Sequence, residues 1–135
     1  MFKQSDQIET RLAMINSILP SSLQHESVLT VLQLALAEDL SAQERWEPQI
    51  AKGDVTSMAT VPVDARLSGY FRAKANGVVA GLPIAEAVFQ LVDPTMSFRT
   101  TTKDGSIVEK GQALAIDQGS GRSLLAGERT ALNYL

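Results

Sequence analysis

Hydrophobic residues recur at helical spacing in the first third of the chain. They predict an opening helix that Ser5 or Asp6 can cap and that Pro20 ends. The apolar positions of this helix are Ile8, Leu12, Ile15 and Leu19. A second helix is predicted from about Ser21, with Gln24 placed for a capping box. Its expected core-facing positions are Val28, Val31, Leu32, Ala35 and Leu36.

From Ala65 the hydrophobic period changes to two, which predicts a half-buried antiparallel strand. Its inward positions are expected to be Leu67, Gly69, Phe71, Ala73 and Ala75. The dipeptide Asn76-Gly77 predicts a tight hairpin turn, with residues 78–80 as the return strand.

After Gly81, the pattern predicts a short helix with Pro83 at its first position and with Asp93-Pro94 at its end. Ile84, Val88 and Leu91 are expected to face inward. Strands are predicted at 96–102, 107–108 and 113–117, separated by turns in which Gly105 and Gly111 supply positive φ. These elements predict an α+β domain whose helices pack on an antiparallel sheet or small sandwich.

The final stretch, 122–135, predicts a helix with an apolar side and a cationic stripe. Leucines at 124, 125, 132 and 135 share one arc, whereas Arg122, Arg129 and Asn133 share another. Two guanidinium groups in line can bind carboxylate or phosphate bidentately, although a solvated polar face explains the same spacing. Glu128 lies inside the leucine arc, either paired with a cation from elsewhere or snorkelling at the edge.

Composition narrows the possible functions. The chain has 135 residues, a net charge of −3 and no cysteine, which excludes disulfides, thiol nucleophiles and cysteine-bound zinc. The acidic balance argues against nucleic acid as a partner. The chain has one histidine, His25, so a multi-histidine metal site is excluded. His25 is expected to be an exposed polar residue, with a catalytic base as the alternative. No signal peptide or membrane span is visible, so a cytoplasmic protein is expected.

Length and the last residues indicate a piece of something longer. A (β/α)8 barrel needs roughly 250 residues and does not fit in this chain. The apolar helical pattern continues through Ala131-Leu-Asn-Tyr-Leu135 without a glycine cap, a proline or a basic last turn.

Three motifs resemble one enzyme family. The run Arg122-Ser-Leu-Leu-Ala-Gly-Glu-Arg-Thr-Ala-Leu-Asn-Tyr-Leu135 resembles the segment that joins the two domains of quinolinate phosphoribosyltransferase. Glu38-Asp39-Leu40 and Gly53-Asp54-Val55-Thr56 resemble a signature of its N-terminal domain, with a longer stretch between the halves than in many relatives. The resemblance covers residues 36–135.

The resemblance implies a domain division. An N-terminal α+β domain is expected at 1–121, with a helical arm at about 5–40, a loop at 41–54 and a sheet region at about 55–119. Residues 122–135 are expected to begin the helix that leads to a C-terminal α/β barrel absent from this chain.

The resemblance also implies an activity. Enzymes of the family transfer a phosphoribosyl group from phosphoribosyl pyrophosphate to the ring nitrogen of quinolinate. The products are nicotinate mononucleotide, CO2 and pyrophosphate, in NAD biosynthesis. Magnesium is expected with the pyrophosphate, and its ligands are expected outside this chain. A homo-oligomer, either a dimer or an assembly of dimers, is implied.

Residue roles follow from the same resemblance. Arg129 is expected to hold a quinolinate carboxylate in the neighbouring subunit's active site. Arg122 shares the helix face and is expected either to join it or to form an interface ion pair. No catalytic group and no metal ligand is expected here, so the isolated chain is expected to be inactive. Asp39 and Asp54 are interpreted as structural, with contact to substrate or metal as the alternative.

Two other functions are compatible with the same sequence. The chain could be a binding or dimerisation domain of a divergent relative, such as the homologue associated with molybdate transport. A biotinyl or lipoyl carrier has similar turns, but Lys74 lies two residues before Asn76-Gly77 and lacks the usual attachment motif. The segment Gly119-Ser120-Gly121 is interpreted as a plain connector, with a phosphate cradle as the alternative.

Overall fold

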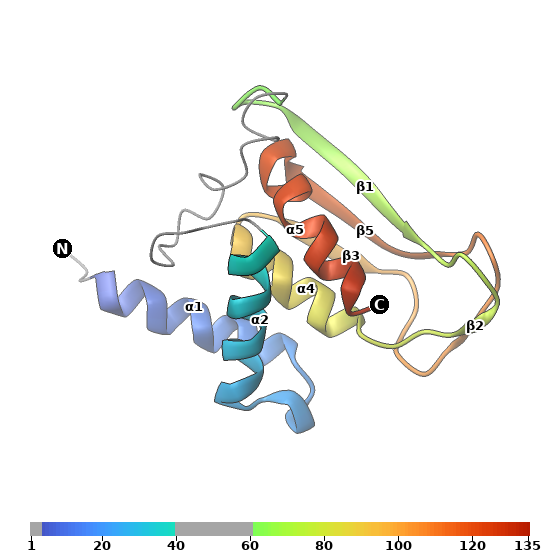
Figure 1. Ribbon diagram of the computed structural model, residues 1–135, viewed down its shortest axis with the longest axis horizontal. Coiled ribbons are helices and arrows are strands. Elements are labelled where there is room, and N and C mark those ends of the chain that lie inside the picture. The colour runs from blue at the N-terminus through green and yellow to red at the C-terminus, as the bar shows by residue number, and fades with distance from the viewer. Residues whose placement is uncertain (1–3, 40–60) are drawn as a thin grey trace.

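The computed structural model describes residues 4–39 and 61–135, with side chains from Glu9 onward (Figure 1). The predicted loop at 41–54, including Asp54, lies outside the described residues. The helices are α1 (Gln4–Ile18), the short 3-10 helix η1 (Ser21–Leu23), α2 (Glu26–Asp39), α4 (Leu82–Val92) and α5 (Gly121–Asn133). The strands are β1 (Arg66–Arg72), β2 (Gly77–Val78), β3 (Ser97–Thr100), β4 (Ile107–Val108) and β5 (Ala113–Ser120).

The main sheet has the strand order β1-β5-β3, with both outer strands antiparallel to β5. Strands β2 and β4 form a separate two-stranded ribbon. Helices α4 and α5 pack against one face of the main sheet, and α1 and α2 extend to the side of these helices away from it (Figure 1). The predicted α+β architecture is therefore confirmed. None of the described helices is both long and apolar enough to span a membrane.

The predicted hairpin at Asn76-Gly77 is wrong. Strand β1 pairs with the distant β5, in register from Arg66 opposite Ser120, and β2 pairs with β4. The Asn76 side chain accepts a hydrogen bond from the backbone N–H of Lys110 at 2.9 Å, which joins the segment after β1 to the segment after β4. Hydrogen bonds to β5 already occupy the inner edge of β1, so local turn chemistry did not decide which strand would pair with it.

Three aromatic rings join the sheet to α4. Phe71 of β1, Phe89 of α4 and Phe98 of β3 have ring centroids 5.6 to 6.0 Å apart. All three side chains are buried, and α4 is enclosed on nearly every side. Because each ring comes from a different element, this cluster fixes the position of α4 on the sheet.

The helical arm is attached to α4 through Arg11 of α1. Its guanidinium donates to the carbonyl of Gln90 at 3.0 and 3.2 Å and to that of Leu91. These carbonyls are at the C-terminal end of α4, where a cation is favoured by the helix dipole.

The boundary and the buried face of the second helix differ from the prediction. Helix α2 begins at Glu26, and the Gln24 side chain donates to the carbonyl of Leu19 at 2.8 Å, so no capping box forms. Leu29 is buried in place of Val31, which is 53% exposed. The buried face therefore consists of Leu29, Leu32 and Leu36.

The last helix also buries a different face from the predicted one. Its buried residues are mostly small: Gly121, Ser123, Leu124, Ala126, Gly127, Thr130 and Ala131. Leu125, Leu132 and Leu135 are exposed at the surface. Helix α4 lies so close that only small side chains fit between the two helices, which placed most of the leucines outside.

The predicted connector at 119–121 is also wrong. Gly119 and Ser120 belong to β5, and α5 begins at the next residue, Gly121. The Ser120 hydroxyl caps α5 by accepting a hydrogen bond from the backbone N–H of Ser123. The central strand therefore runs directly into the last helix.

Candidate functional site

Arg129 lies in the third turn of α5, and its side chain is 80% exposed. Its Nε is 3.6 Å from Oδ1 of Asp39, the last residue of α2. The other carboxylate oxygen of Asp39, Oδ2, accepts a hydrogen bond from the hydroxyl of Thr130. Thr130 is fully buried, and the Asp39 side chain is only 18% exposed. One carboxylate thus contacts two consecutive residues of α5.

The position of Asp39 is unfavourable for its own helix. A carboxylate in the last helical turn is opposed by the helix dipole, and α2 has no basic residue there to compensate. Asp39 contacts two residues of its own chain, as expected of a structural residue, but these partners are not local. They lie about ninety residues further along the chain, on α5. Asp39 of the Glu-Asp-Leu motif therefore meets Arg129 and Thr130 of the Glu-Arg-Thr-Ala-Leu-Asn motif in space.

Arg122 is not brought together with Arg129. It lies in the first turn of α5, and its Nε donates to the carbonyl of Val61 at 2.8 Å. Arg129 is seven positions after Arg122 on the helix, about 10 Å along the axis. Arg122 is half-buried and fastens the start of α5 to the segment before β1. The predicted part of Arg122 in substrate binding or in an interface ion pair stays a prediction.

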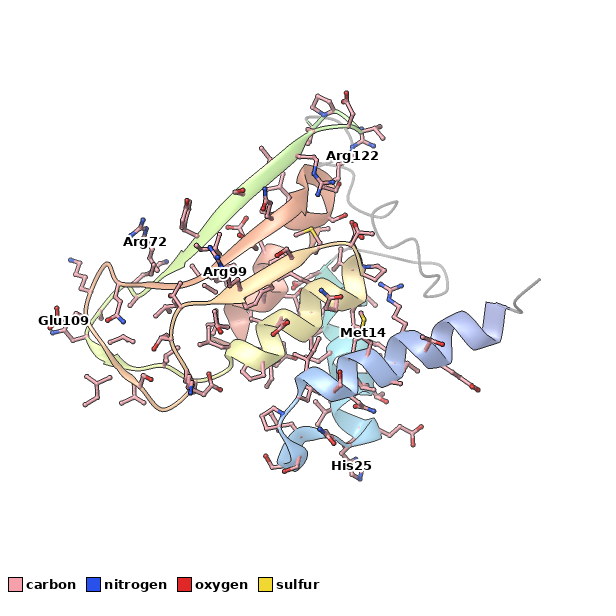
Figure 2. The ribbon with its side chains drawn as sticks, turned by 180° about the vertical axis from the view of Figure 1, so that it is seen from behind. Met14, His25, Arg72, Arg99, Glu109 and Arg122 are labelled. Carbon is pink, nitrogen blue, oxygen red and sulfur yellow. The ribbon has the colours of Figure 1, made fainter. Side chains whose placement is uncertain are left out.

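His25 lies far from these arginines. It is exposed in the turn before α2, with Nδ1 2.7 Å from the hydroxyl oxygen of Ser27. Figure 2 shows His25 and Arg122 at opposite ends of the molecule. The prediction of an exposed polar histidine is confirmed.

The surroundings of Arg129 on α5 are partly apolar. Leu125 and Leu132 are four residues before it and three residues after it, so all three share one helix face. Their exposed fractions are 38% and 50%. The predicted separation into an apolar side and a cationic stripe is therefore wrong, because the exposed leucines flank the arginine. Glu128 is exposed beside this face.

Two carboxyl groups, one buried on β5 and one half-buried after α4, had no signal in the sequence pattern. Burial, and more weakly Glu128, raises the pKa of Asp117 on β5, against the backbone amides of Asp117 and Gly69, which lower it. Burial also acts to raise the pKa of Asp93, but hydrogen bonds from Thr95 and Ser123, with the charge of Arg11, leave that pKa below its usual value. The Ser123 hydroxyl donates to Asp93 at 2.8 Å and thereby joins α5 to the end of α4.

A second group of arginines lies on the face of the sheet opposite α4 and α5. Arg66, Arg72 and Arg99 are exposed there, and the Arg72 guanidinium lies 5.5 Å from the centroid of the Tyr70 ring. Figure 2 shows Arg72 and Arg99 along the sheet, away from Arg122. Within the described ranges, no group of three or more metal-binding side chains is present.

The fold and the surroundings of Arg129 define the class of protein. It is an α+β domain in which an exposed arginine, tethered by a carboxylate from another helix, lies among exposed leucines on the last helix.

Comparison with known proteins gives the family. The model for the N-terminal domain of quinolinate phosphoribosyl transferase matches residues 54–135, more than half of the chain. The chain therefore belongs to this family.

Relatives of known name agree with that assignment. Nicotinate-nucleotide pyrophosphorylase (carboxylating) of Arabidopsis thaliana is 36% identical over 118 residues, which is 87% of this chain and 31% of that protein. Quinolinate phosphoribosyltransferase (decarboxylating) 1b of Nicotiana tabacum is 38% identical over 105 residues, covering 78% and 27%. The chain thus spans less than a third of either relative.

A crystal structure of NadC from Streptococcus pyogenes superposes with a TM-score of 0.67 at 30% identity. The superposition covers 79% of this chain and 35% of the NadC chain. The nicotinate-nucleotide pyrophosphorylase of Francisella tularensis, at 22% identity and a TM-score of 0.62, shares the fold.

Proposed function

We propose that this chain is the N-terminal part of an enzyme that converts quinolinate and phosphoribosyl pyrophosphate to nicotinate mononucleotide, CO2 and pyrophosphate. Family membership supports this proposal, as do the names of the relatives. The observation that carries the role of the chain is the position of Arg129. Arg129 is the arginine of the Glu-Arg-Thr-Ala-Leu-Asn motif. Its side chain is 80% exposed and paired with Asp39.

The reaction needs fixed positive charge. Quinolinate carries two carboxylates and must be held against a pyrophosphate, so a site that excludes water needs several preorganised cations. Arg129 supplies one of them, by clamping a quinolinate carboxylate. We infer that the remaining cations and the catalytic groups lie in the C-terminal α/β barrel that the resemblance to the family implies. Magnesium enters with phosphoribosyl pyrophosphate, and its ligands belong to that barrel as well.

The exposed leucines support a composite site. Leu125 and Leu132 flank Arg129, and apolar side chains on a surface favour burial against another part of the assembly. Burial there would also exclude water and strengthen the pairing of Arg129 with a carboxylate. We infer a homodimer in which Arg129 reaches the neighbouring subunit's site. A cytoplasmic location stays a prediction, since the name of the Arabidopsis relative places that protein in the chloroplast.

The test is isothermal titration of quinolinate into this 135-residue chain and into the complete enzyme that carries it. Binding is expected for the complete enzyme alone. Arg129→Ala in that enzyme is expected to weaken quinolinate binding about 10- to 100-fold, the loss typical of one charge-assisted hydrogen-bonded contact. Arg99→Ala is the matched control, because that arginine is also exposed but lies on the opposite face of the sheet.

Each failure has a distinct meaning. Similar, small effects of Arg129→Ala and Arg99→Ala would remove the assigned role of Arg129. If the complete enzyme does not bind quinolinate, the chain belongs to a divergent relative and acts as a binding or dimerisation domain. Turnover by the isolated chain would contradict the assignment of catalysis to the barrel.

A further inference from the structure

We propose that Asp39 is a positioning residue for Arg129. Its carboxylate, fixed by Thr130, holds the Nε side of the guanidinium, so that the two terminal nitrogens are presented to a carboxylate of the substrate. This inference rests on the proposed function of Arg129 as the clamp on quinolinate.

The geometry of the guanidinium carries the first step. The group is planar and has five N–H donors in a fixed fork, of which Nε carries one. Asp39 lies on the Nε side, 3.6 Å away, while 80% of the arginine side chain is exposed. With Asp39 on the Nε side, the edge formed by the two terminal nitrogens remains able to bind a second carboxylate bidentately.

The tether is itself fixed. Asp39 is mostly buried at the end of α2, and the hydroxyl of Thr130 holds its second oxygen. Thr130 has no exposed surface, so its hydroxyl cannot turn to water. Because Thr130 and Arg129 are neighbours on α5, the carboxylate is locked to the helix that carries the arginine. An otherwise flexible side chain is thereby restricted before substrate arrives.

The charge of Asp39 and its positioning of Arg129 have opposite effects on quinolinate binding. A carboxylate beside the clamp repels an anionic substrate, so removing its charge should lower the KM for quinolinate if Asp39 acted only through its field. Loss of orientation should raise that KM instead. The sign of the change therefore separates positioning from electrostatics, and a purely structural role would leave KM unchanged.

The experiment uses the complete enzyme with Asp39→Asn, Arg129→Ala and the double variant. Asparagine keeps an oxygen that can accept the Thr130 hydroxyl, so the melting temperature should change little. The KM for quinolinate is expected to rise about two- to fivefold in Asp39→Asn, the range for one exposed ion pair. The KM for phosphoribosyl pyrophosphate should not rise with it. In the Arg129→Ala background, Asp39→Asn should cause no further rise.

The outcomes are distinguishable. If Arg129→Ala raises KM while Asp39→Asn lowers it or leaves it unchanged, the positioning role is overturned and the clamp stands. Independent, multiplying effects in the double variant would also overturn it. If Arg129→Ala has no effect, both the clamp and the positioning role fail.

A second variant covers the case in which Asp39→Asn does not fold. Arg129→Lys keeps the positive charge but has no Nε for Asp39 to hold and no fork for a bidentate contact. It is expected to raise the quinolinate KM several-fold. A lysine enzyme with the KM of the wild type would overturn the proposal.

Discussion

Replacing Gly127 with alanine tests how α5 is seated on α4. A Cβ at this position would be 2.8 Å from Cδ1 and 2.9 Å from Cε1 of Phe89, and 3.5 Å from a methyl of Val92. Phe89 is fully buried, with the rings of Phe71 and Phe98 at centroid distances of 6.0 and 5.6 Å, so it has little room to retreat.

Two terms of opposite sign decide the magnitude. Alanine in place of glycine inside a helix stabilises it by about 1 kcal/mol. Forcing an extra methyl group into a packed core costs about 1–3 kcal/mol. Because an aromatic ring held on both sides cannot yield cheaply, the upper part of that range applies. The net destabilisation should be about 1–2 kcal/mol.

Urea denaturation followed by circular dichroism measures this loss. With an m-value of about 2 kcal/mol/M, the midpoint should fall by about 0.5–1 M. Adding Phe89→Leu to Gly127→Ala should cost less than the sum of the two single variants, since the smaller side chain makes room for the methyl group. A Gly127→Ala protein as stable as the wild type would refute the close contact between α5 and α4.

Two further variants test charged groups that folding removes wholly or partly from water. Asp117→Asn should stabilise the fold at pH 7. Folding raises the pKa of Asp117, so the folded protein becomes less stable as the pH rises and this carboxyl ionises, whereas asparagine stays neutral. That gain should shrink toward pH 4, near the unfolded pKa of about 3.9, and an equal gain at both pH values in urea titrations would contradict it. Arg11→Met should lower the free energy of unfolding by about 1–2 kcal/mol, through loss of the hydrogen bonds to the Gln90 and Leu91 carbonyls. An unchanged thermal midpoint would show that this contact does not stabilise the arm.

Helix ends were predictable because their signals are local. Pro20 and Asp93-Pro94 stop helices by removing or redirecting backbone hydrogen bonds, and both helices end within two residues of these signals. Gly105 and Gly111 have φ of 85° and 86°, as the turn pattern predicted. Such features depend on a few neighbouring residues and not on the rest of the fold.

Strand pairing and helix faces were not predictable in the same way. The partner of β1 is selected by contacts with β5 and by Phe71 meeting α4, neither of which an alternating pattern contains. For α5, the pattern favoured the leucines as the buried face. The close approach of α4 instead required glycine and alanine there.

The candidate site shows the same difference between local signals and long-range contacts. Spacing alone could not rank Arg129 above Arg122, and the family motif was needed to do so. In the structure the two arginines have different surroundings, because Arg122 donates to the Val61 carbonyl whereas Arg129 is exposed beside Asp39. The contact between Asp39 and Thr130 joins residues 91 positions apart, a relation that no local pattern contains.

The direct passage from β5 into α5 fixes the phase of Arg129 around its helix. With 3.6 residues per turn, inserting or deleting one residue between Ser120 and Arg129 would rotate the guanidinium by about 100° about the helix axis. The arginine would then leave Asp39 and face a different direction. The sheet therefore sets the direction of the Arg129 side chain. Turns at the far end of the domain can change in length, but the number of residues between the central strand and Arg129 cannot.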